Sequence, residues 1–485
     1  KTASLGVYAL LLGVAWIGFN AVPPGFVPTQ DKQYLVSFAQ LPDGATLDRT
    51  EAVIRAMSDI ALKEPGVESA IAFPGLSING FVNNPSAGIV FVSLKPFEER
   101  TTPELAGGAI AGSLQAKFSG LTEAFIAIFP PPPVQGIGQI GGFKLQVEDR
   151  TDQGYEALDA AMKAVVEKAR QRPELANVFS GYKIGVPQLY ADLDRTRAMQ
   201  IGVDVDEVFA TMQAYLGSLY VGDFNKFGRT YQVIAQADQP FRDSADDILR
   251  LRTRNADGQM VPLGAFMQVR EITGPDTVGR YNGFRAADLN GAPAPGYSTG
   301  QAEQAMVEVL NETLPKGMRF EWTDLTYQQI LAGDTTLLVF PICVLLVFLV
   351  LAAQYESLYL PLAVILTVPM SLMSAIVGVW ITGGDNNVFT QIGLFVLVGL
   401  ASKNAILIVE FARELEHHGR TAVAAAIEAA RLRLRPILMT SLAFIMGVVP
   451  LVVSTGAGAE MRHAMGVAVF AGMLGVTLFG LFLTP

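Results

Sequence analysis

The sequence predicts an α-helical membrane domain with six transmembrane helices, joined to an α+β region outside the bilayer. Of the 485 residues, 51% are hydrophobic, and the mean hydropathy of +0.35 is unusual for a soluble protein. The apolar residues gather in residues 1–30 and 331–485, whereas charged residues occur throughout the middle region, residues 31–330. Strand and helix patterns alternate in this middle region, which favours an α+β architecture there.

Six segments are long and apolar enough to cross a bilayer, because a spanning helix needs about 20 mostly apolar residues. We place them at residues 4–22, 335–353, 358–382, 388–410, 436–454 and 464–484. The loop expected between the fourth and fifth segments is rich in arginine: Arg413, Arg420, Arg431, Arg433 and Arg435. Since such loops stay in the cytoplasm, we expect the middle region on the opposite side of the membrane.

The middle region contains two copies of one predicted motif. In residues 31–135 we expect strands at 34–41, 67–73, 88–95 and 124–129, with helices at 47–62 and 103–118. This β-α-β-β-α-β order is the split βαβ motif, an antiparallel sheet with both helices on one face. The second copy occupies 136–185 and 270–330, with strands at 143–148, 176–180, 281–289 and 319–323 and helices at 153–170 and 298–314.

An insert, residues 186–269, divides the second copy. It contains a strand at 189–194, helices at 195–201 and 205–215, and two hairpin-like stretches, one with the turn sequence NADG. The proline-rich stretch FPPPPVQGIG, residues 129–138, joins the two copies. Its prolines favour a stiff polyproline II path, so it is either a plain rigid linker or a linker that also walls a cleft between the copies.

The composition argues against several classes of protein. The net charge of −10 and the lack of a basic stripe with interleaved aromatic residues speak against nucleic-acid binding. The chain has three histidines and none of the HExxH, GxSxG or Walker motifs, so an enzyme is disfavoured. The single cysteine, Cys343, leaves the middle region without a disulfide framework, which its size makes unnecessary.

The fourth membrane segment carries Lys403 and Asn404 deep in its apolar sequence. A charge there costs roughly 2.5–3.5 kcal/mol on insertion scales, so such a residue usually faces a partner inside the protein. On the next helix, Arg433 and Thr440 are seven residues apart and share one face, which predicts a polar core between the two helices. The alternatives are that Lys403 snorkels to the interface and that the arginines only mark the cytoplasmic side.

The carboxylate expected beside Lys403 is missing from the six segments, where acidic residues mark only ends and loops: Asp334, Asp385, Glu410 and Glu460. Because a buried lysine without such a partner is costly, we expect the acidic group on helices outside this chain. The chain also starts at Lys1 and stops at the end of the last segment. Both observations predict that it is about half of a longer polypeptide.

Seven stretches of the sequence are distinctive: GLASKNAILIVEFA, RLRLRPILMTSLAFIMGVVPLVVSTGAGAEMR, PPGFVPTQD, LPDGAT, NADGQMVPLGAF, RYNG and LAAQYES. Together they resemble the resistance–nodulation–division (RND) efflux transporters of the hydrophobe/amphiphile class, and the resemblance covers the whole chain. It implies twelve membrane helices in two similar halves, of which this chain is the C-terminal half. The two split βαβ copies then look like periplasmic porter subdomains, and the insert looks like part of a docking domain.

The resemblance also implies roles for named residues. Lys403, Arg433 and Thr440, with Asn404 beside them, match the family's proton relay, whose two aspartates would lie in the N-terminal half and share protons with shifted pKa values. The family's substrate pocket maps onto Ile71, Phe73, Leu76, Ile78, Phe91 and Phe129. Several family phenylalanines are aliphatic here, but apolar burial is non-directional and still suits promiscuous binding. Without the family, these residues are interpreted as ordinary core and loop packing.

The implied function is drug/proton antiport across the bacterial inner membrane, driven by the proton gradient without a cofactor. By resemblance, the protein captures amphiphilic drugs on the periplasmic side and works as a homotrimer with a periplasmic adaptor and an outer-membrane channel. A metal-ion exporter is disfavoured, since no methionine lies between Met57 and Met162, where soft-metal ligands would be needed. A non-transporting half kept for assembly or binding stays open as an alternative, whereas a membrane enzyme is disfavoured by the lack of a catalytic cluster.

Overall fold

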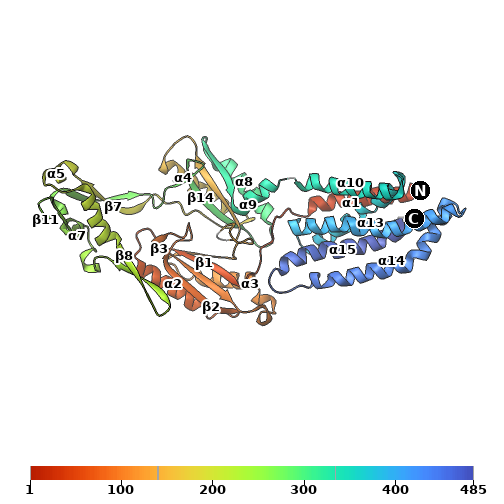
Figure 1. Ribbon diagram of the computed structural model, residues 1–485, viewed down its shortest axis with the longest axis horizontal. Helices are drawn as coiled ribbons and strands as arrows, with labels where there is room; N and C mark the ends of the chain where they lie inside the picture. The colour runs from red at the N-terminus through yellow and green to blue at the C-terminus, as the bar shows by residue number, and fades with distance from the viewer. Residues whose placement is uncertain (1, 139–140, 334, 484–485) are drawn as a thin grey trace. The chain divides into compact units, whose positions relative to one another are not determined.

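The computed structural model describes residues 2–138, 141–333 and 335–483 (Figure 1). The chain divides into two compact units, of which the first comprises Lys1–Tyr182 and Val278–Pro485 and the second comprises Lys183–Thr277. The first unit contains two sheets with their covering helices and all of the long apolar helices. The second unit is a small α/β body.

The apolar ends of the chain are helical: α1 (Thr2–Ala21), α10 (Thr335–Tyr355), α11 (Tyr359–Ile365), α12 (Val368–Ile381), α13 (Val388–His417), α14 (Ala422–Val452) and α15 (Ala459–Leu483). Five stretches of the described residues are long and apolar enough to span a membrane: Leu338–Tyr355, Tyr359–Ile381, Val388–His417, Ala422–Val452 and Ala459–Gly480. In α1 the apolar stretch found is shorter, Tyr8–Ala21, so the count of six stays a prediction. The predicted segment 464–484 ends outside the described residues. Figure 1 shows α13, α14 and α15 lying side by side.

Two parts of the helical region differ from the sequence prediction. The arginine-rich stretch expected to be a loop is mostly helical, since α13 runs to His417 and α14 starts at Ala422. Arg, Glu, Leu and Ala all have high helix propensity, which carries both helices beyond their apolar residues. The predicted segment 358–382 is interrupted between α11 and α12. Pro369 lacks the N–H that would bond to the carbonyl of Ile365 and continue the helix.

The first sheet has four antiparallel strands in the order β2-β3-β1-β4: β1 (Tyr34–Gln40), β2 (Val67–Leu76), β3 (Asn83–Leu94) and β4 (Phe125–Phe129). Helices α2 (Leu47–Ala61) and α3 (Gly107–Phe118) cover one face of it. Side chains alternate between the faces of a strand, so Leu35 and Ala39 join the core beneath the helices whereas Phe38 points to the other side. Strands β2 and β3 are longer than predicted because their pairing continues to Leu76 and Asn83.

The second sheet has the order β13-β14-β5-β15, and β6 also pairs with β14. Its elements are β5 (Phe143–Asp149), α4 (Tyr155–Ala169), β6 (Leu175–Phe179), β13 (Gly279–Tyr281), β14 (Phe284–Pro293), α8 (Thr299–Thr313) and β15 (Met318–Thr323). The predicted strand 281–289 is instead interrupted by a turn, since Tyr281 ends β13 and Phe284 starts β14. Asn282 and Gly283 have φ values of 49° and 84° and form a two-residue hairpin loop, for which Asn-Gly is the preferred sequence. After β15, α9 (Asp324–Ala332) leads toward α10.

The second unit is built on a ribbon of two antiparallel strands, β7 (Val186–Leu193) and β12 (Met267–Gly274). The other α-helices and strands are α5 (Arg195–Gln200), α6 (Val205–Met212), β8 (Leu219–Lys226), β9 (Arg229–Ala235), α7 (Ala245–Arg250), β10 (Arg252–Arg254) and β11 (Met260–Pro262). The border expected after residue 269 falls inside β12, and the unit ends at Thr277. The reason is that Gly274 still pairs with Val186, so the whole ribbon belongs to one body.

Candidate functional site

The face of the first sheet that α2 and α3 leave uncovered is apolar. Because neighbouring strand residues alternate between faces, β1, β3 and β4 all contribute side chains to this side. Together with Ile78 from the turn between β2 and β3 and Phe179 from a strand of the second sheet, these side chains form one buried cluster: Val36, Phe38, Ile78, Ile89, Ala127, Phe129 and Phe179. The two sheets of the first unit therefore meet at this face.

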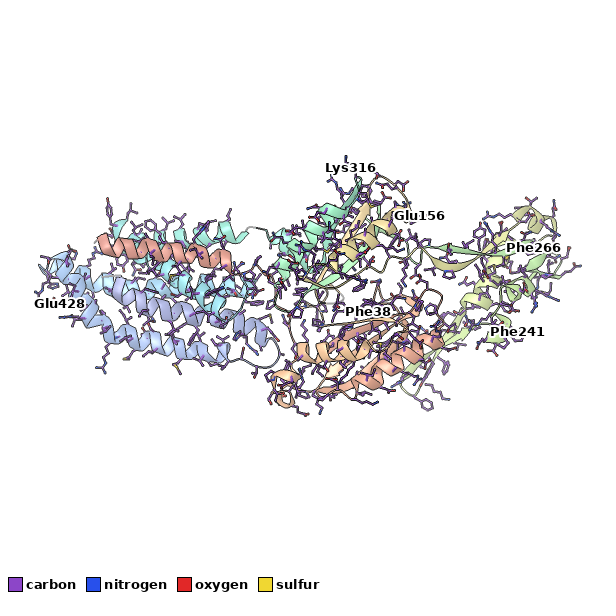
Figure 2. All side chains as sticks on the ribbon, turned by 180° about the vertical axis from the view of Figure 1, so that it is seen from behind. Phe38, Glu156, Phe241, Phe266, Lys316 and Glu428 are labelled. Atoms are coloured by element: carbon purple, nitrogen blue, oxygen red, sulfur yellow. The ribbon has the colours of Figure 1, made fainter. Side chains whose placement is uncertain are left out.

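Four aromatic rings, Phe38, Phe125, Phe129 and Phe179, pack together here and are called the phenylalanine cluster. The ring centroids of Phe38 and Phe179 lie 4.9 Å apart, and those of Phe38 and Phe129 lie 6.1 Å apart with nearly parallel rings. Phe179 also lies 6.1 Å from Phe125 and 6.0 Å from Phe129. Phe38 is labelled in Figure 2. Such distances are those at which aromatic pairs stabilise one another beyond simple burial.

The six predicted pocket residues belong to this same side of the first sheet: Ile71, Phe73, Leu76, Ile78, Phe91 and Phe129. They differ in exposure, because Ile78 and Phe129 are buried whereas Ile71 is 52% and Phe73 is 42% exposed. The rings of Phe73 and Phe91 pack edge to face with centroids 5.8 Å apart. Ile71 and Phe73 are therefore accessible to a ligand, and Phe129 is part of the core.

Sequence reasoning misses three members of the phenylalanine cluster, Phe38, Phe125 and Phe179. Phe38 and Phe125 alternate with residues that face the helices, and this period of two along each predicted strand is a signal for a shared face. No local pattern identifies Phe179, since its contact with Phe38 depends on how the two sheets pack. The cluster as a whole is therefore visible only in the folded chain.

The predicted relay residue Lys403 lies on an exposed stripe of α13 together with Ile392, Val396, Gly399 and Glu410. These positions are spaced by three, four or seven residues, so they share one face of the helix. A Cβ atom added at Gly399 would meet nothing within 4 Å, so the stripe has room for the close approach of another helix. Within the part of the chain that the structure describes, the Lys403 side chain makes no hydrogen bond or ion pair.

The remaining predicted relay residues lie on α13 and α14 without bonding to Lys403. Asn404 is buried and donates a hydrogen bond to Ser441 Oγ at 3.1 Å, which joins the two helices. The Thr440 hydroxyl instead donates to the carbonyl of Ile437 in its own helix, at 3.2 Å. The sequence does not predict the role of Ser441, because Ser441 and the adjacent Thr440 both carry hydroxyl groups. The sequence alone does not show which of the two faces α13.

Arg433 contacts α13 through an aromatic ring. Its guanidinium carbon lies 4.3 Å from the centroid of the Phe411 ring, a cation–π geometry. Its Nε is buried and has no hydrogen-bond partner among the described residues. A buried donor without a partner is costly, so this side chain and Lys403 are two cationic groups that an added acidic partner would satisfy.

A half-buried carboxyl group holds α9 against α8 just before the membrane helix α10. Glu303 accepts hydrogen bonds from Thr326 Oγ1 at 2.9 Å and from Gln329 Nε2 at 3.1 Å. Burial raises the pKa of Glu303 to about 7 from its ordinary 4.5, although the two hydrogen bonds act in the opposite direction. The group therefore titrates near neutral pH at the point where the second sheet connects to the apolar helices.

We expect Glu303→Gln to stabilise the protein at pH 8 and to change little at pH 4. The folded state binds the proton of Glu303 more tightly than the unfolded state, so stability falls as pH rises from about 4.5 to about 7. The variant does not lose this stability, so above neutral pH its free energy of unfolding exceeds that of the wild type by about 2–3 kcal/mol. Thermal unfolding of the purified protein at both pH values measures it. An offset between variant and wild type that is equal at both pH values would contradict the assignment.

The chain is similar to known proteins along its whole length. The model of the AcrB/AcrD/AcrF family matches residues 1–485. The multidrug/solvent efflux pump membrane transporter MepB of Pseudomonas putida is 39% identical over 488 residues, which is 100% of this chain and 46% of that protein. The multidrug export protein AcrF of Escherichia coli is 37% identical over 483 residues, covering 99% of this chain and 46% of its own length.

The toluene efflux pump membrane transporter TtgB of Pseudomonas putida is 39% identical over 488 residues, again 100% of this chain and 46% of the relative. The chain thus spans about half the length of the curated relatives it matches. The RND resemblance predicted from the sequence is confirmed. Because the family model covers its full length, the chain belongs to the AcrB/AcrD/AcrF family of RND transporters.

Proposed function

We propose that this chain is the C-terminal half of a proton-driven exporter of amphiphilic small molecules in the bacterial inner membrane. The relatives are multidrug, solvent and toluene efflux pumps by name, and the chain matches about half of each. The five apolar helices supply the membrane part. The observation that carries the proposal is the exposed charge of Lys403 on the open stripe of α13, since a lysine at that depth requires an acidic partner.

The substrate site is the uncovered face of the first sheet. Its accessible residues Ile71 and Phe73 and the half-buried Phe91 offer an apolar surface above the phenylalanine cluster. Apolar contact is non-directional, so molecules of different shape gain similar free energy from this surface. The strand orders of the two sheets support their identification as split βαβ porter subdomains.

The energy source is a proton relay between the two halves of the transporter. Acidic residues of the N-terminal half face Lys403, and their protonation removes the attraction that holds the helices together. The stripe of α13 is then free to repack, and the two packings form the states between which substrate moves. Arg433, Thr440 and Asn404 belong to the same relay, with the buried Nε of Arg433 as a further donor to the acidic group.

The transporter works as a homotrimer with a periplasmic adaptor and an outer-membrane channel. In the second unit, the hairpin β8–β9 carries an exposed row of large apolar residues, among them Phe224 and Phe227, the latter 83% exposed. Exposed apolar surface of this kind is typical of protein–protein contacts. A non-transporting assembly half and a metal-ion exporter remain the competing functions, which transport measurements separate from a drug exporter.

The test is transport of a fluorescent amphiphilic dye by the complete transporter in proteoliposomes. Dye movement that starts when a pH gradient is imposed and stops when an ionophore collapses it supports the proposal. Dye binding without gradient-dependent movement would support the assembly half instead. Movement of a soft metal ion but not of dye would favour the metal exporter.

Phe73→Ala is expected to weaken dye binding about tenfold without changing the unfolding temperature. The side chain is 42% exposed, so its removal opens no cavity in the core, but a bound dye loses part of the roughly 1.5–3 kcal/mol that burial of a phenylalanine supplies. Fluorescence polarisation measures the dissociation constant. Phe209→Ala, a similarly exposed phenylalanine in the second unit, is the matched control. Equal affinity losses in both variants would argue against the site.

A further inference from the structure

The segment that follows α1, residues 23–31, contacts both membrane helices and sheet elements, and is called the strap. Its first half is bonded to the start of α13. Asn386 N–H donates to the carbonyl of Pro23 at 2.9 Å, and Val388 N–H donates to the carbonyl of Phe26 at 3.0 Å. A Cβ at Gly25 would lie 1.9 Å from Asp385 Oδ2, so a larger residue at this position requires the strap or the Asp385 carboxylate to move.

The same half of the strap is bonded to the N-terminus of α8 in the second sheet. Ser298, the N-cap residue of α8, donates from Oγ to the carbonyl of Pro24 at 2.8 Å. A Cβ at Gly300 would lie 2.6 Å from the same carbonyl oxygen, so the helix end and the strap are in direct contact. The strap therefore connects α13, the helix that carries Lys403, with α8, a helix that packs on the second sheet.

The second half of the strap is bonded to α15 and to the first sheet. The N–H of Asp31 donates to Glu460 in the first turn of α15 at 3.1 Å. The Asp31 carboxylate accepts two hydrogen bonds from the Arg100 guanidinium, at 2.7 and 3.1 Å, and one from the N–H of Gly107 at the start of α3, at 2.9 Å. One residue thus links a membrane helix to a helix of the first sheet.

Arg100 is held from several sides. Its side chain is 1% exposed, and it also donates to the carbonyls of Lys95 and Leu105. Burial alone would raise the pKa of Asp31, but the hydrogen bonds from Arg100 and from the backbone outweigh this and lower it, so the pair stays ionised. A buried two-bond ion pair fixes orientation as well as distance.

We propose that Asp31 and Arg100 are positioning residues of the transport cycle, which transmit movements of α13 and α15 through the strap to the first sheet. The inference rests on the proposed function, because it concerns how the relay reaches the substrate site. Rigid contacts at both ends of a short segment are what such coupling requires, since a displacement at one end must reappear at the other. A merely structural ion pair would stabilise the first sheet without affecting proton-driven movement.

The test compares Arg100→Lys with Arg285→Lys in the complete transporter. Lysine keeps the charge of Arg100 but cannot make the two parallel bonds to Asp31. Arg285 is a matched control, because it is a half-buried arginine paired with Asp149 and Asp152 in the second sheet and does not touch the strap. The readouts are dye affinity, unfolding temperature and gradient-driven dye transport in proteoliposomes.

Arg100→Lys is expected to lower transport at least tenfold while the dye dissociation constant stays within twofold of the wild type, and Arg285→Lys to retain transport. Gly25→Ala, which places a methyl group against the Asp385 carboxylate and leaves the ion pair intact, is expected to behave like Arg100→Lys. The loss of transport in each of the three variants could instead be fully explained by its loss of stability or of dye affinity. That result would contradict a coupling role for Asp31 and Arg100. A wild-type protein without gradient-driven transport would instead refute the proposed function.

Discussion

Lys403→Ala is expected to abolish proton-driven dye transport in the complete transporter, with a loss of at least a hundredfold, while dye binding and assembly are retained. In the proposed relay, this charge is the counterion of acidic residues in the other half, so its removal would leave no difference in attraction between their protonated and ionised forms. The side chain lies on the exposed stripe of α13 and bonds to no described residue, so this chain folds without it.

The measurement is dye transport in proteoliposomes with an imposed pH gradient, at equal amounts of assembled protein. Ile392→Ala serves as the control, since Ile392 lies on the same stripe of α13 but carries no charge. Transport at the wild-type rate in Lys403→Ala would remove Lys403 from the relay. An equal loss in both variants would show that packing along the stripe matters and that the charge does not.

The predicted relay residues show how much of a candidate site the sequence alone can predict. Lys403 stands out because a charge in an apolar run has few structural explanations. The sequence places its neighbour Asn404 in the same polar core, but the partner of Asn404, Ser441, depends on the rotation of α14 about its axis. That rotation is set by packing between helices, and Thr440 and Ser441 differ by only one position, so the sequence alone cannot choose between them.

The two sheets likewise show which features of the fold the sequence predicts and which it does not. Periodicity predicts most strands and helices, because each element buries one face and its apolar residues recur with the period of that element. Asn282 and Gly283 are the preferred residues of a hairpin turn, yet the predicted strand 281–289 runs through them. The prediction of a loop for the arginine-rich stretch is wrong, because it is based on low hydropathy. The residues of this stretch have high helix propensity, so both helices continue beyond their apolar segments. The contact of Phe179 with Phe38 is long-range and has no local signal.

Phe129→Ala is expected to destabilise the first sheet by about 3–5 kcal/mol, in contrast with the small effect of Phe73→Ala. Phe129 is 1% exposed and its ring packs against Phe38 and Phe179, so truncation leaves a cavity between the two sheets. Phe73 lies on the same side of the sheet but is exposed, and its removal leaves no such cavity.

The unfolding temperature of the purified protein and its susceptibility to proteolysis within the first sheet measure this difference. Phe129→Leu is the matched variant, since leucine fills much of the space and is expected to recover more than half of the lost stability. If Phe129→Ala unfolds at the wild-type temperature, the two sheets do not share a core. If Phe129→Ala is destabilised and also binds dye as weakly as Phe73→Ala, the buried phenylalanine cluster holds the substrate-binding residues of β2 and β3 in place. The cluster then contributes to dye binding indirectly, without touching the dye.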